Sequence, residues 1–159
     1  MRVMDVMARI GEAVELGRTG DAEAARRRMA ELWEDGEVQA DPLHRCTLAH
    51  FAADLQATVV DELAWDLRAL EAADEITAER AREHHPDLDV AGFYPSLHLN
   101  LGDAYQRLGD AAGARHHLER ARASADRLPD SEQGQYADRG YGRMIRAGIE
   151  ALGQRCGEP

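Results

Sequence analysis

Apolar residues recur along this chain at intervals of three and four residues, the period of an α-helix. The clearest example lies near the C-terminus, where one helical face carries Ala137, Tyr141, Met144, Ile145, Gly148, Ile149 and Leu152. The alternation of β-branched and polar residues that is typical of strands is nearly absent. The pattern therefore predicts an all-α fold.

Residues that favour helix ends divide the pattern into about seven helices. Asp21 and Asp41 are predicted N-caps, and Pro42 suits a first helical position. The prolines at 86 and 95 bound a predicted break at about 85–94. The helices are expected at about 2–16, 21–34, 41–58, 61–83, 95–108, 110–128 and 133–153, and residues 156–159 are expected to fray.

One predicted hairpin, at 95–128, carries a distinctive spacing of small and large residues. Leu101-Gly102 and Tyr105 are followed by Ala114 and Leu118. This spacing resembles the tetratricopeptide repeat, a helix–turn–helix unit of roughly 34 residues. It also makes physical sense, because Gly102 and Ala114 would be small where two helices cross closely.

Weaker copies of the same pattern indicate two further repeats, so that the units span about 6–36, 42–84 and 95–128. The resemblance implies a right-handed solenoid of three helical hairpins, closed by a C-terminal capping helix at 133–153. Residues 1–155 would then form a single domain. The alternative is an irregular helical bundle that contains one such hairpin.

Composition and charge narrow the classes of function. The chain has 159 residues and a net charge of −11, which argues against nucleic-acid binding because phosphates require a basic surface. No run of roughly 18 apolar residues indicates a membrane span, and the first residues lack a signal-peptide pattern, so we expect a cytoplasmic protein. All 19 basic residues are arginine, as is typical of a GC-rich, actinobacterial-type genome, and lysine chemistry is excluded.

The resemblance also implies where a partner would bind. In tetratricopeptide proteins the first helix of each pair lines a concave groove that binds peptides. The corresponding groove positions in this chain are Met7, Ile10, Val14, Cys46, His50, Asp54, Ser96, Leu99, Asp103, Gln106, Arg139, Arg143 and Arg146.

Three of the groove positions on the predicted capping helix, at 133–153, are arginines. Arg139, Arg143 and Arg146 share one helical face, and guanidinium groups bind carboxylates in a forked, two-bond geometry. We therefore expect a non-catalytic protein- or peptide-binding module whose partner has an apolar segment and an acidic group or C-terminus. Two alternatives stay open, in which the arginines are solvated or pair with acids such as Asp103. Self-association also stays open.

A second class of function is a small-molecule- or metal-binding protein, with or without enzymatic activity. His50, Asp54, His98 and Asp103 are its candidate residues, because imidazole and carboxylate groups bind divalent metals. No H-E-x-x-H or G-x-S-x-G motif supports catalysis. The sequence therefore predicts that the protein is not an enzyme and that it binds neither a cofactor nor a metal.

The remaining histidines and the cysteines have simpler interpretations. His98 occupies a position where the repeat packs a large side chain, so it is expected in the core. His116 and His117 are expected at the surface, because His117 precedes the core residue Leu118. Cys46 and Cys156 are far apart in sequence and are expected to be free thiols.

Overall fold

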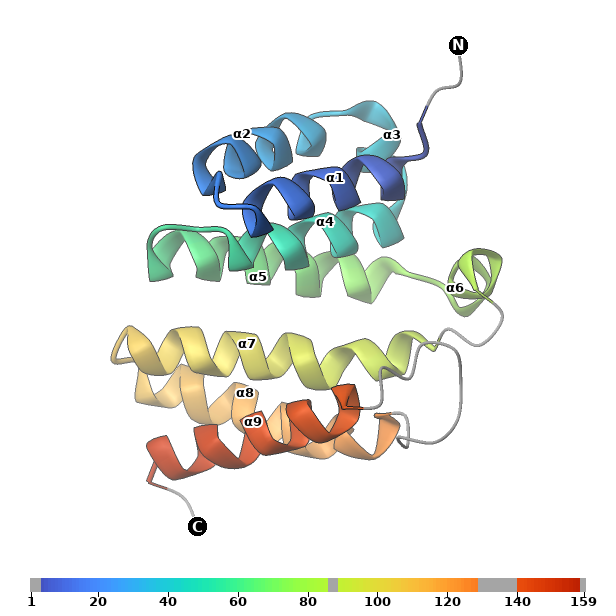
Figure 1. Ribbon diagram of the computed structural model, residues 1–159. Helices are drawn as coiled ribbons and strands as arrows, with labels where there is room; N and C mark the ends of the chain where they lie inside the picture. The colour runs from blue at the N-terminus through green and yellow to red at the C-terminus, as the bar shows by residue number, and fades with distance from the viewer. Residues whose placement is uncertain (1–3, 86–88, 129–139, 158–159) are drawn as a thin grey trace. The chain divides into compact units, whose positions relative to one another are not determined.

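The computed structural model describes residues 4–85, 89–128 and 140–157, and its regular structure there is entirely helical (Figure 1). These described residues form nine α-helices and two 3-10 helices. They belong to two compact units, Met1–Glu75 and Ile76–Pro159, and each is described by itself. The prediction of an all-α fold is confirmed.

The N-terminal unit contains two helical hairpins. Helix α1 (Val6–Arg18) pairs with α2 (Ala22–Trp33), and α4 (Pro42–Asp54) pairs with α5 (Val59–Glu75), with the short α3 (Gly36–Gln39) between them. Helix α4 also packs against both α1 and α2. The core of this unit is built from buried apolar side chains of all five helices, which include Ile10, Met29, Leu32, Val38, Leu48 and Ala69.

The predicted caps at Asp21 and Asp41 are confirmed. The Asp21 carboxylate accepts a hydrogen bond of 3.0 Å from the backbone N–H of Ala24, and that of Asp41 accepts one of 3.0 Å from Leu43. Pro42 occupies the first turn of α4, where the missing N–H costs nothing. Gly20 supplies the positive φ of 107° between α1 and α2, a conformation that glycine adopts without a Cβ clash.

The C-terminal unit contains one hairpin and a helix that packs on it. It comprises α6 (Ala78–His84), η1 (Val90–Phe93), α7 (Tyr94–Arg107), α8 (Ala111–Ser124), η2 (Ala125–Arg127) and α9 (Tyr141–Arg155). Helix α9 packs against both α7 and α8. Their core cluster consists of Leu118, Ala121, Leu128, Ile145, Ile149 and Leu152.

The expected close crossing at Gly102 is present in this unit. A Cβ atom on Gly102 would lie 2.7 Å from Leu152 Cδ2 and 3.4 Å from the Ala114 carbonyl oxygen. Ala114 and Leu152 are themselves fully buried. Glycine at 102 is therefore what lets α8 and α9 approach α7 so closely.

Several helices differ from the sequence-based prediction. The expected helix at 61–83 is two helices, because Thr77 caps α6 by accepting a 3.1 Å hydrogen bond from the Arg80 N–H. Helix α3 was not predicted, since four residues are too few to show a helical period. Helix α9 begins at Tyr141, and residues 133–139 of the predicted capping helix lie outside the described residues. The described part of the chain thus has nine α-helices instead of about seven, whereas a solenoid arrangement of the hairpins stays a prediction.

Candidate functional site

The predicted groove residues of the N-terminal unit differ widely in exposure. Ile10 and Cys46 are buried in the core, with exposed fractions of 1% and 5%. Met7, Val14 and His50 are half-buried. Burial raises the pKa of the Cys46 thiol to about 12, so this side chain is an inert apolar group at neutral pH.

His50 and Asp54 lie one turn apart on α4 but form no hydrogen bond or ion pair with each other. The Nδ1 atom of His50 is buried and has no hydrogen-bond partner among the described residues. Burial lowers the pKa of His50, and burial raises the pKa of Asp54 against the opposing effect of the nearby imidazole. Both shifts favour the neutral forms, so the pair does not behave as a fixed ion pair.

The predicted groove residues on α7 already have partners within the C-terminal unit. The Ser96 hydroxyl donates to the Phe93 carbonyl at 3.0 Å, and Leu99 packs against the core cluster. Asp103 Oδ1 lies 2.7 Å from Arg155 Nη1, which is 3.2 Å from Gln106 Oε1 as well. A second arginine, four residues after Asp103 on α7, pairs with Oδ2 at 2.8 Å. Asp103 is therefore neutralised by arginines that were not assigned to the groove.

Two of the three predicted groove arginines, Arg143 and Arg146, lie on the solvent side of α9. Arg143 and Arg146 are exposed, and they form no hydrogen bond or ion pair with any residue that the structure describes. Met144, which follows Arg143 directly, has an exposed fraction of 61%, although the apolar pattern placed it in the buried stripe. Arg139 lies outside the described residues. We define Arg143, Met144 and Arg146 as the α9 patch.

The predicted surface position of His117 is wrong, whereas the core position of His98 is confirmed. His117 is 8% exposed and His98 is 4% exposed, and their Nδ1 atoms are 3.0 Å apart. The N–H group of one imidazole donates a hydrogen bond to the other ring. Burial lowers the pKa of His117 to about 4, and the positive charges of the neighbouring His116 and Arg120 contribute to the same shift to a lesser extent.

Aromatic rings enclose this histidine pair from both sides. Tyr105 stacks on His117 with an interplanar angle of 3°, and Tyr94 stacks on His98. The pair was not predicted, because a residue directly before a core leucine is expected to face away from the core. The real buried face is wide enough to include His117 next to Leu118.

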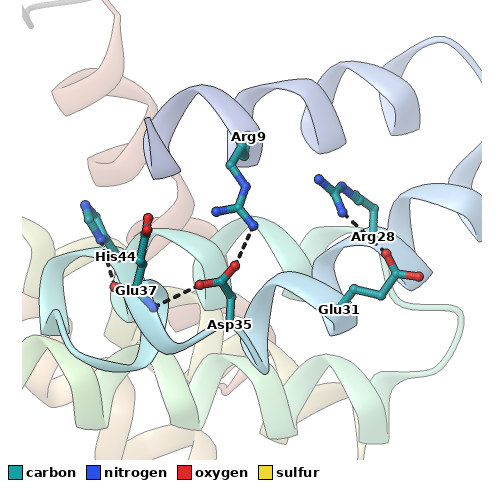
Figure 2. Close-up of polar contacts among 6 residues, drawn as sticks. All are labelled: Arg9, Arg28, Glu31, Asp35, Glu37 and His44. Atoms are coloured by element: carbon teal, nitrogen blue, oxygen red, sulfur yellow. Dashed lines mark hydrogen bonds and ion pairs between the residues drawn. The ribbon is translucent and has the colours of Figure 1, made fainter. Parts of the chain in front are cut away.

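A polar network in the N-terminal unit serves the fold (Figure 2). Arg9 of α1 binds Asp35 at 2.6 Å, and the same carboxylate accepts a 2.9 Å hydrogen bond from the Glu37 N–H and so caps α3. Arg9 and that backbone bond lower the pKa of Asp35. The carboxylate therefore joins α1 to the start of α3, and Arg28 and Glu31 form a separate pair at 3.4 Å.

The described residues do not assemble a metal centre. No group of three or more histidine, cysteine, aspartate or glutamate side chains among them could hold a metal ion. His50 and Asp54 belong to one unit, whereas His98 and Asp103 belong to the other. Both cysteines are free thiols, as predicted.

Comparison with protein-family models, with curated proteins and with solved structures found no match to this chain. Among the described helices, none is both long and apolar enough to cross a membrane. Within the part of the chain that the structure describes, the α9 patch combines two exposed arginines that have no ion-pair partner with one exposed methionine.

Proposed function

We propose that this chain is a non-catalytic protein- or peptide-binding module made of tetratricopeptide-like hairpins. The same local arrangement in both units supports this proposal. In each unit a helix follows a hairpin and packs on both of its helices: α4 on α1 and α2, and α9 on α7 and α8. Stacking of this kind is how helical repeats bury the faces that a single hairpin leaves exposed.

The observation that carries the binding role is the α9 patch. Its two arginines have no hydrogen-bond or ion-pair partner among the described residues, and exposed Met144 follows Arg143 directly along α9. Arginine and methionine are enriched at protein interfaces, and an arginine fork recognises carboxylates with two parallel hydrogen bonds. A partner with an acidic group next to an apolar segment fits this surface.

Fluorescence anisotropy with defined peptides tests the role. The probes are labelled peptides that combine a leucine-rich segment with two glutamates and a free C-terminal carboxylate, and each has a matched peptide with glutamine and a C-terminal amide. We expect the acidic peptides to bind more tightly. We also expect an Arg143→Ala/Arg146→Ala variant to lose about tenfold in affinity, because two charged contacts together contribute about 1.4 kcal/mol.

The matched control is Arg82→Ala/Arg115→Ala. It removes the same charge from exposed positions on α6 and α8 of the same unit. Binding that falls equally in both double variants would mean that net charge, and not the α9 patch, governs association. No saturable binding of any acidic peptide to the intact chain would overturn the proposal.

A further inference from the structure

The two tryptophans of the chain meet at a right angle in the N-terminal unit. Trp33 is the last residue of α2, and Trp65 lies in the first half of α5. Their ring centroids are 5.3 Å apart and their planes are inclined by 88°. The rings form two walls of an aromatic corner, which we call the tryptophan corner.

Arg68 of the same chain occupies the tryptophan corner. Its Cζ atom lies 4.4 Å from the centroid of Trp65 and 5.5 Å from that of Trp33. Arg68 is exposed and makes no hydrogen bond or ion pair with any residue in the described ranges, although Glu71 follows at ion-pair spacing. Among the described residues, this guanidinium therefore interacts with the two tryptophan rings.

The charge around the tryptophan corner favours cations. The N-terminal unit has 17 acidic and 8 basic residues, a net charge of −9 out of −11 for the whole chain. In α5 Arg68 is the sole basic residue, and the acidic ones are Asp61, Glu62, Asp66, Glu71, Asp74 and Glu75. A field of this sign attracts cations and repels anions.

The geometry points to a cationic ligand rounder than a guanidinium. The planar guanidinium of Arg68 comes close to one ring and stays more than an ångström farther from the other. A tetrahedral alkylammonium group, which is weakly hydrated and roughly spherical, can contact both walls of a right-angled corner. Aromatic walls of this kind bind quaternary ammonium groups in proteins.

We propose that the tryptophan corner is a binding site for a quaternary or methylated ammonium group, and that Arg68 is an internal occupant that the ligand displaces. Displacement requires only rotation of an exposed side chain that has no hydrogen bond to break among the described residues. The site is separate from the α9 patch and does not depend on the function proposed for it.

Tryptophan emission tests this site directly, because Trp33 and Trp65 are the only tryptophans in the chain. We expect tetramethylammonium chloride to change the emission in a saturable manner, and sodium chloride at equal concentration to leave it unchanged. Arg68→Ala should lower the dissociation constant about two- to fivefold, since the ligand no longer competes with an exposed cation–π contact.

Two further variants complete the test. Trp33→Leu removes one wall and keeps Trp65 as the reporter, and it should weaken binding about fivefold. Arg27→Ala removes the same charge as Arg68→Ala from an exposed residue of α2 that pairs with Glu23, and it should leave the dissociation constant unchanged. Absence of saturation in both the intact chain and Arg68→Ala, or equal affinity of these two proteins, would overturn the proposal.

The source of the ammonium group can be separated in the same assay. An acetylated peptide that contains trimethyllysine is compared with tetramethylammonium and choline. Tighter binding of the peptide supports a site for a modified protein side chain, whereas equal binding of all three supports a site for a small metabolite. Failure of all three to bind would overturn the inference.

Discussion

Individual side chains in this protein take their chemistry from burial more than from their sequence neighbours. His116 and His117 are adjacent, yet His116 is exposed and His117 lies in the hairpin core against His98. The sequence shows two equivalent histidines. Only the packing of α7 on α8 makes them different, because it removes one imidazole from water.

The buried histidine predicts a loss of stability in mild acid. Burial lowers the pKa of His117 from its ordinary value of about 6.5 to about 4 in the folded protein, so the unfolded state binds more protons between these values. The free energy of unfolding should therefore fall as the pH falls from about 6.5 to about 4, by up to about 1.4 kcal/mol per pH unit. Urea unfolding at a series of pH values measures this slope.

Two phenylalanine variants assign the slope to a residue. His117→Phe keeps a ring against Tyr105 but cannot bind a proton, so its slope should be shallower than that of the wild type. His116→Phe changes an exposed neighbour and should keep the wild-type slope. The same slope in all three proteins would contradict the account of His117.

At the scale of the helix, the sequence predicts best where a single local interaction decides the outcome. Asp21 and Asp41 could be identified as caps because each binds a backbone N–H two or three residues later. Thr77 does the same for α6, but its signal lay inside a continuous helical pattern. Short α3 depends on Asp35, whose partner Arg9 is 26 residues away and cannot be inferred from a local pattern.

Glycines inside helices give a prediction that separates local propensity from packing. Gly102→Ala should destabilise the C-terminal unit by about 1–3 kcal/mol, because the new Cβ would lie 2.7 Å from Leu152 in the core. Gly11→Ala should stabilise the protein by about 0.5–1 kcal/mol. The glycine is exposed on α1, and apart from its own stretch of helix no atom lies within 4 Å of where the new Cβ would be. Urea unfolding monitored by circular dichroism measures both changes.

Opposite signs are the essential part of this prediction. Each substitution adds the same methyl group to a helix interior, so helix propensity alone would stabilise both variants. A stabilised Gly102→Ala protein would contradict the close crossing of α7 with α8 and α9.

At the scale of the whole molecule, the candidate site depends on contacts that the sequence could suggest but not decide. The helical face of Arg143 and Arg146 could be predicted from spacing alone. The sequence could not show whether Asp103 neutralises these two arginines, because its actual partner, Arg155, lies 52 residues farther along the chain. The burial of Ile10 and Cys46, both assigned to the groove by resemblance, is likewise a consequence of tertiary packing.

Charge is distributed unevenly between the two units, and this bears on binding. The C-terminal unit has 13 acidic and 11 basic residues, a net charge of −2, whereas the N-terminal unit has −9. The α9 patch therefore lies in the less acidic unit, whose small net negative charge repels an acidic partner less than that of the N-terminal unit would. The tryptophan corner lies in the more acidic unit and suits a cation.

The proposed binding role assigns partner recognition to the α9 patch. Its most direct test is to add the tightest acidic peptide from the anisotropy assay to isotope-labelled protein and to follow the amide and arginine Nε–H signals by NMR. We expect the largest shifts to cluster at Arg143, Met144 and Arg146 and to disappear in Arg143→Ala/Arg146→Ala. Shifts that cluster elsewhere, or that persist in the double variant, would contradict it.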